Sequence, residues 1–178
     1  METLSIKRLK HRVLLVEDGS ESVDLVRMIC ENVDEDMVLK CVDTAERAQQ
    51  VLEDDPQFDL IISDHFLAGP MTGLDLWRTC KKSFSQVPFM MTSSLPVDEF
   101  LKLVRGEWDY PLYLHKPFYK KDCQHMIDWY LNEIPKRRKR VENRVAQAIS
   151  DAHDFGSLEY GTFVAFVLLI LLIATRMV

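Results

Sequence analysis

The chain has few of the residue patterns that build metal clusters, disulfide frameworks or nucleotide-binding loops. Its four cysteines (Cys30, Cys41, Cys80 and Cys123) are scattered and form no C-x-x-C pair. This favours reduced, structural thiols over a disulfide framework or a zinc site. The five histidines show no metal-ligand spacing, and no P-loop motif is present. The chemistry must therefore come from other residues.

Positive charge is scarce in most of the chain. The net charge is −6, and residues 1–134 carry 15 basic against 24 acidic side chains, whereas residues 135–178 carry 7 against 4. An acidic body argues against nucleic acid as its main partner, and no DNA-binding helix-turn-helix is recognisable. The first eleven residues are polar and basic, without the apolar core of a signal peptide.

Short apolar runs alternate with helical patterns through residues 12–131. Strands are expected at residues 12–16, 37–42, 58–64, 87–91 and 110–115. Helices are expected over residues 20–32, 43–53, 74–84, 96–105 and 118–131, with Ser20 and either Asp43 or Thr44 as caps. This alternation predicts an α/β fold with a five-stranded, doubly wound parallel sheet that carries helices on both faces.

Polar residues stand at the carboxyl ends of four predicted strands. Glu17 and Asp18 follow the first, Asp64 ends the third, Thr92 follows the fourth and Lys116 follows the fifth. Carboxyl ends of parallel strands lie along one edge of the sheet, where ligands bind, so these side chains can converge. Taken singly, each has an ordinary structural explanation, because Asp starts turns, Thr caps helices and Lys covers surfaces.

Three carboxylates at one edge repel one another unless a proton or a cation lies among them. Mg²⁺ suits such oxygen ligands, because it takes one or two carboxylates together with phosphoryl oxygens. The cluster therefore predicts phosphoryl transfer, with Asp64 as a nucleophile that forms an acyl phosphate. A flavodoxin-type phosphate loop is disfavoured by Glu17 and Asp18. A dehalogenase-type phosphatase would need a second Asp at position 66, which is Phe66.

The four motifs, in this order on alternating strands and helices, resemble the receiver domain of response regulators in two-component signalling, the CheY-like family. The resemblance covers about residues 10–132. It implies a flavodoxin-like sheet order 2-1-3-4-5 and a phosphoacceptor at Asp64. It also implies a Mg²⁺ site formed by Glu17, Asp18, Asp64 and the main-chain carbonyl of Phe66.

The resemblance assigns further roles around the phosphoacceptor. Thr92 follows the phosphoryl group, Lys116 supplies the counter-charge before a cis peptide to Pro117, and Tyr113 is the aromatic switch. The implied partners are a histidine kinase or phosphotransfer protein, and an output protein bound at the face of the fourth helix, fifth strand and fifth helix. The family acts as a phosphoacceptor rather than an enzyme. A homodimer is left open. His65 and Phe66, and a longer loop before Gly73, depart from the usual pattern.

The last quarter of the chain goes beyond the receiver pattern. The expected organisation is a receiver domain over residues 1–133, a basic linker and amphipathic helix over 134–157, and a membrane-anchor helix over 158–178. Residues 160–175 carry no charge and as a helix would span about 24 Å, against a hydrocarbon core of about 30 Å. The basic run 136–140 places the receiver on the cytoplasmic side of the inner membrane.

Alternative interpretations of the tail, and of the function of the whole chain, stay open. The apolar segment is also compatible with a helix buried in a dimer or in another protein, and the basic run with a nucleic-acid contact. The leading hypothesis is a receiver switched by phosphorylation of Asp64, with output through a protein contact at the membrane. The alternative is a phosphate-independent scaffold or assembly protein that works mainly through its tail. A metal-dependent hydrolase is a weaker third hypothesis.

Overall fold

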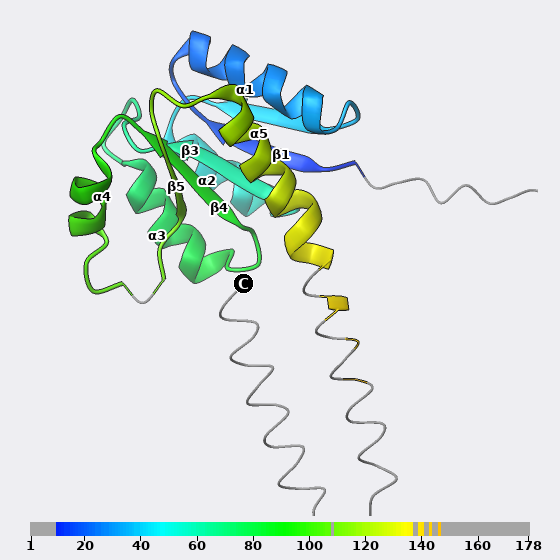
Figure 1. The fold of residues 1–178 in the computed structure, drawn as a ribbon. Helices are drawn as coiled ribbons and strands as arrows, with labels where there is room; N and C mark the ends of the chain where they lie inside the picture. Colours follow the sequence, from blue (N-terminus) through cyan, green and yellow to red (C-terminus); the bar gives the residue numbers. More distant parts are fainter. Residues whose placement is uncertain (1–9, 108, 137–138, 141–142, 144–145, 147–178) are drawn as a thin grey trace, which may run out of the picture. The chain divides into compact units, whose positions relative to one another are not determined.

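A five-stranded parallel sheet organises the chain, for which the computed structural model describes residues 10–107, 109–136, 139–140, 143 and 146 (Figure 1). The strand order is β2-β1-β3-β4-β5, so the predicted fold class and sheet order are confirmed. The elements are β1 (Arg12–Val16), α1 (Ser20–Val33), β2 (Val38–Val42), α2 (Ala45–Asp54), β3 (Leu60–Asp64), α3 (Gly73–Ser83), β4 (Phe89–Ser93), α4 (Val97–Leu103), β5 (Leu112–His115) and α5 (Lys120–Asp128).

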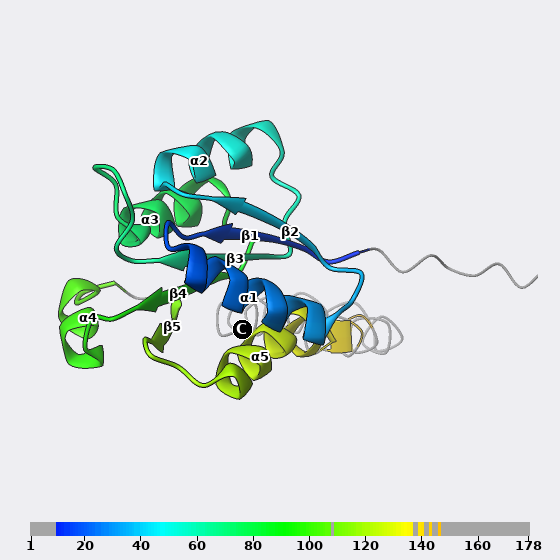
Figure 2. The same cartoon turned by 90° about the horizontal axis from the view of Figure 1, so that it is seen from above.

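Helices cover both faces of the sheet because the central strands are apolar on both faces. Every residue of β3 and β4 is buried, as expected for parallel strands between two helical layers. Helices α1 and α5 pack against each other on one face, and α2 and α3 lie together on the other (Figure 2). Phe100 and Val104 bring α4 into the same hydrophobic cluster as α2 and α3.

Several predicted boundaries are corrected by hydrogen bonding. The fourth strand covers residues 89–93 rather than 87–91, because Pro88 has no N–H and β4 takes its register from Asp64, which pairs with Thr92. Ser20 does not cap α1, whose cap is Gly19. Thr44 does cap α2, since its side chain accepts a hydrogen bond from the N–H of Arg47 at 3.2 Å.

The chain divides into two units, residues 1–128 and 129–178. The second begins with a π-helical turn, η1 (Trp129–Glu133), and its other described residues are helical, which agrees with the predicted C-terminal helical extension. No helix among the described residues is long and apolar enough to cross a bilayer. The predicted anchor at residues 158–178 lies outside the described residues, as does most of the predicted helix at 141–155.

Gly73, the first residue of α3, packs tightly against the end of β3. A Cβ at this position would lie 2.1 Å from the main-chain oxygen of Asp64. The N–H of Gly73 donates to the carbonyl of His65 at 3.0 Å. Only glycine allows this contact, since a methyl group cannot overlap a main-chain oxygen. The position of α3 and that of Asp64 are therefore fixed together.

We expect Gly73→Ala to lower the free energy of unfolding by about 3 kcal/mol, because the added methyl group forces α3 away from β3. Gly106→Ala is the control: Gly106 has a φ of +89° but open space around it, so only the backbone preference is lost, about 1 kcal/mol. Urea unfolding of the two variants gives the comparison. Equal losses would show that the contact with Asp64 is not tight.

Candidate functional site

Asp64 ends the central strand β3 at the edge where the strand order reverses. The neighbouring strand β1 leads directly into Glu17, and β4 on the other side places Thr92 opposite Asp64. The main-chain N–H of Lys116 donates to the carbonyl of Ser93 at 2.7 Å, which extends the ladder between β4 and β5 beyond the strands. Open α/β sheets bind ligands at such a switch point. The sequence prediction that these strand ends share one edge is confirmed.

The ammonium of Lys116 lies between two carboxylates. It donates to Asp64 Oδ2 at 2.6 Å and to Glu17 Oε2 at 2.7 Å. The three side chains are only 21%, 11% and 5% exposed for Lys116, Asp64 and Glu17 respectively. Burial disfavours the charged ammonium, but the hydrogen bonds to Asp64 and Glu17 outweigh it and raise the pKa of Lys116. One cation therefore holds β1, β3 and β5 together at this edge.

Main-chain groups fix the remaining carboxylate oxygens. Asp64 Oδ1 accepts a hydrogen bond from the N–H of Phe66 at 3.1 Å, and Glu17 Oε1 accepts one from the N–H of Gly19 at 3.2 Å. Each carboxylate is thus oriented by one N–H and by the shared ammonium. Two oriented carboxylates that face a single point make a ready binding site for a cation.

The donor set suits Mg²⁺, although it is smaller than the sequence predicted. Glu17 and Asp64 offer two hard oxygen ligands to one point, and Mg²⁺ needs only one or two carboxylates because it retains water. Asp18 is exposed, and no group of three or more His, Cys, Asp or Glu side chains within the described part of the chain could hold a metal ion. The roles of Glu17, Asp18, Asp64 and the Phe66 carbonyl as ligands stay predictions.

Tyr113 connects β5 to the loop between β4 and α4. Its ring stacks on Phe100 of α4 with centroids 4.1 Å apart, and its hydroxyl donates to the carbonyl of Leu95, with Ser93 O at 3.4 Å. Burial raises the pKa of the phenol. Thr92, only 2% exposed, lies in β4 directly before Ser93. The hydroxyl of Tyr113 therefore contacts residues that follow the other predicted switch residue closely in the chain.

Two residues, His65 directly after Asp64 and Glu46 on α2, have structural features that the sequence did not indicate. His65 is 6% exposed, and its Nδ1 has no hydrogen-bond partner among the described residues. Burial lowers the pKa of this imidazole. Glu46 of α2 accepts a hydrogen bond from the N–H of Met71 at 3.1 Å and so fastens the loop before α3. Because the two residues are 25 positions apart, no local pattern could reveal this contact.

Comparisons with known proteins agree with this geometry. The family model for the response regulator receiver domain matches residues 13–128. No match was found among curated protein sequences. Solved structures with the same fold include the signal receiver domain of an HD domain-containing protein from Pseudomonas fluorescens Pf-5, at 19% identity and a TM-score of 0.60, covering 70% of this chain and 97% of that one.

Two further receiver structures give the same result. A response regulator receiver domain protein from Clostridium thermocellum has 17% identity and a TM-score of 0.60, with 70% of this chain and 97% of that one covered. The non-phosphorylated HemR receiver domain from Leptospira biflexa has 22% identity and a TM-score of 0.59, with 69% and 95% covered. The family match covers well over half of the chain, and the strand order and the charged edge agree with it. The chain belongs to the family of response regulator receiver domains.

Proposed function

We propose that the chain is a phosphorylation-switched signalling receiver, which accepts a phosphoryl group on Asp64 from a histidine kinase or a phosphotransfer protein. Membership of the receiver family supports phosphorylation-dependent signalling in general. The observation that carries the specific proposal is the ammonium of Lys116, 2.6 Å from one oxygen of Asp64 and 2.7 Å from Glu17. A buried carboxylate next to a fixed cation is suited to form an acyl phosphate.

The reaction uses the groups at the sheet edge in distinct roles. A carboxylate oxygen of Asp64 forms a bond to phosphorus while the bond from phosphorus to the donor imidazole breaks. Lys116 neutralises charge on the phosphoryl oxygens. Bound by Glu17, Asp18, Asp64 and the carbonyl of Phe66, Mg²⁺ would add further neutralisation. The chain itself is the phosphoacceptor, with slow autodephosphorylation as its own chemistry.

The output follows from the residues beyond β4. A phosphoryl group on Asp64 offers an acceptor to the hydroxyl of Thr92, which pulls on the β4–α4 loop that Tyr113 contacts. The face made by α4, β5 and α5 then changes and binds an output protein. Exposed apolar residues on and next to these elements support a protein contact there; they include Val97, Leu101 and Tyr119. Phosphorylation acts by favouring one of two existing states.

With acetyl phosphate and a magnesium salt, we expect the wild-type chain to gain the mass of one phosphoryl group and Asp64→Asn to gain none. Asp54→Asn, which changes an exposed carboxylate at the end of α2, is the matched control and should behave as wild type. Intact-mass spectrometry measures the uptake. An unmodified wild-type chain would favour the phosphate-independent scaffold, and steady hydrolysis of unrelated phosphate esters would favour the hydrolase.

We expect Lys116→Met to tighten Mg²⁺ binding about tenfold, because Glu17 and Asp64 lose their shared counter-ion and attract another cation more strongly. Phosphoryl uptake should slow about a hundredfold, since the charge on the phosphoryl group is no longer neutralised. Calorimetric titration and intact-mass spectrometry measure the two effects. Lys102→Met, which removes an exposed lysine paired with Asp98 on α4, is the control. Unchanged Mg²⁺ affinity would contradict a metal site between these carboxylates.

The tail suggests where the output contact is made. Residues 160–175 carry no charge, and the basic run 136–140 precedes them. This pattern supports an anchor helix over residues 158–178, a linker over 134–157 and a receiver over 1–133, with the receiver at the cytoplasmic face of a membrane. The same segment buried in a dimer or in a partner protein would instead make the tail an assembly element.

We expect the full chain to sediment with membranes after cell fractionation, and a chain lacking residues 158–178 to stay in the supernatant. A high-salt wash is the control, because salt releases a protein held only by its basic run, whereas an inserted helix requires detergent. Phosphoryl uptake at Asp64 should be the same for both chains. A full-length chain that stays in the supernatant without detergent would rule out the anchor.

A further inference from the structure

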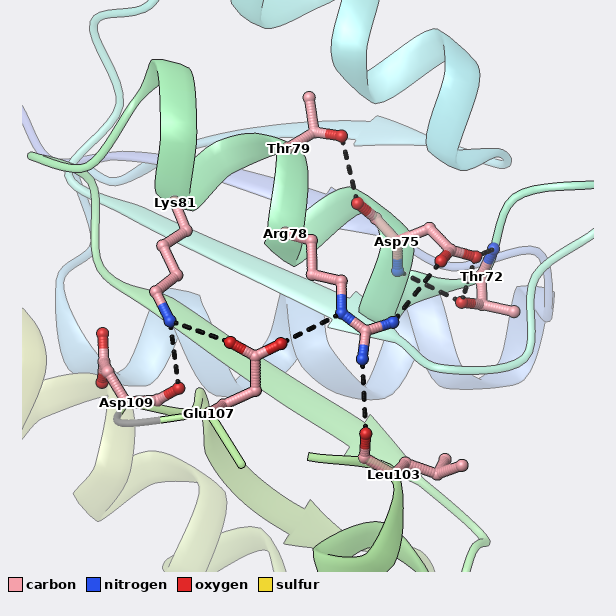
Figure 3. A network of polar contacts seen from close by, with 8 residues as sticks. All are labelled: Thr72, Asp75, Arg78, Thr79, Lys81, Leu103, Glu107 and Asp109. Atoms are coloured by element: carbon pink, nitrogen blue, oxygen red, sulfur yellow. Dashed lines mark hydrogen bonds and ion pairs between the residues drawn. The ribbon is translucent and has the colours of Figure 1, made fainter. Parts of the chain in front are cut away.

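The carboxyl end of α4 is tied to α3 by a network of polar contacts (Figure 3). Glu107, just beyond α4, accepts hydrogen bonds from Arg78 Nε at 3.4 Å and from Lys81 Nζ at 3.2 Å. Arg78 also donates to the carbonyl of Leu103 at 3.3 Å, and Lys81 to that of Asp109 at 3.4 Å. We call the three side chains of Arg78, Lys81 and Glu107 the Glu107 clamp.

The clamp differs from an ordinary surface ion pair. Both oxygens of Glu107 are used, each by a different cation, and the same two cations bind carbonyls on both sides of Glu107. Lys81 also lies over the ring of Trp77, 4.7 Å from its centroid. The hydrogen bonds from Lys81 and Arg78 hold the pKa of Glu107 below its ordinary value. Networks of this kind restrain the chain more than isolated exposed pairs do.

Helix α3 links this clamp to the phosphoacceptor. Its first residue, Gly73, packs against the main chain of Asp64, and a reciprocal capping box between Thr72 and Asp75 closes the same end. Arg78 lies 3.8 Å from Asp75, so one side chain contacts both the first turn of α3 and the end of α4. Buried residues along α3 keep it fixed on the sheet; they are Leu74, Leu76, Trp77 and Cys80.

The amino end of α4 is connected differently. Pro96 precedes the helix and gives it no side-chain cap. The preceding residue, Leu95, is held by Ser93, whose hydroxyl accepts from its N–H at 3.1 Å, and by the hydroxyl of Tyr113, which donates to its carbonyl. These contacts run to β4 and β5, next to Thr92. One end of α4 is therefore coupled to the switch residues and the other to α3.

Resting on the proposed phosphorylation of Asp64, we propose that the Glu107 clamp fixes the carboxyl end of α4, so that phosphorylation moves its amino end and pivots the helix about residues 103–107. Phe100, 1% exposed and stacked on Tyr113, holds the middle of the helix against the core. The position of the pivot determines which part of the α4 surface moves on phosphorylation. Val97, near the moving end, is repositioned most, and Leu103 at the clamp is repositioned least.

Amide hydrogen exchange of Glu107→Gln and wild type, each with and without acetyl phosphate and a magnesium salt, tests the pivot. The reporters at the clamp are the N–H groups of Val104 and Glu107, which donate to Phe100 and Val104 at 3.2 and 3.0 Å. Asp98→Asn is the matched control, because it removes an equal charge and an ion pair within α4 without touching α3. Intact mass of the same samples reports phosphoryl uptake.

Without phosphate, we expect Glu107→Gln to speed exchange at residues 103–107 about tenfold and Asp98→Asn to leave it within about twofold. On phosphorylation, amide exchange in wild type and Asp98→Asn should change at residues 94–101 but not at 103–107, whereas exchange in Glu107→Gln should change at both.

Normal exchange at 103–107 in unphosphorylated Glu107→Gln would overturn the clamp, whatever happens at Asp64. An equal response of both ends in phosphorylated wild type would overturn the pivot. Absence of a mass gain would overturn the proposed function and the pivot together.

Discussion

The ammonium of Lys116 is the interaction on which the functional edge depends. Three strands end there, and the carboxylates of Glu17 and Asp64 reach one cation at 2.7 and 2.6 Å. Removing two carboxylates from water is costly, and leaving one of them unpaired after burial costs more than the pair gains. This cation therefore offsets the repulsion between the two carboxylates, and the same pair of oxygen donors suits a divalent cation, with which Lys116 competes.

The fold was predictable because its signals are local and repeated. Apolar runs of strand length, each followed by a helical pattern, indicate a parallel sheet, and the register of Asp64 with Thr92 agrees with the expected convergence of strand ends. The boundary errors are small. The fourth strand begins at Phe89, after Pro88, rather than at residue 87, and Gly19 rather than Ser20 caps α1.

The candidate site was only partly predictable, for a physical reason. Asp64, Glu17 and Lys116 could be found because a polar residue at the end of a buried strand is locally conspicuous. Glu46 and Glu107 could not, since each contacts groups that are distant in sequence, a loop N–H for Glu46 and two cations of α3 for Glu107. By itself, each looks like any acidic surface residue. His65 lies in the bend after β3, and its burial could not be predicted because it depends on the packing around that strand end.

Helix α3 contacts both the candidate site and the residues that follow α4. Its first residue, Gly73, packs against the main chain of Asp64, and Arg78 in its middle and Lys81 in its last turn hold Glu107. The charges near Asp64 explain why a fixed position of α3 matters. Glu17, Asp64 and Lys116 sum to one negative charge, and a phosphoryl group in place of a free carboxylate adds about one more. In the proposed switch, the added charge would attract hydrogen-bond donors such as Thr92, and a fixed α3 would direct the resulting displacement into the β4–α4 loop.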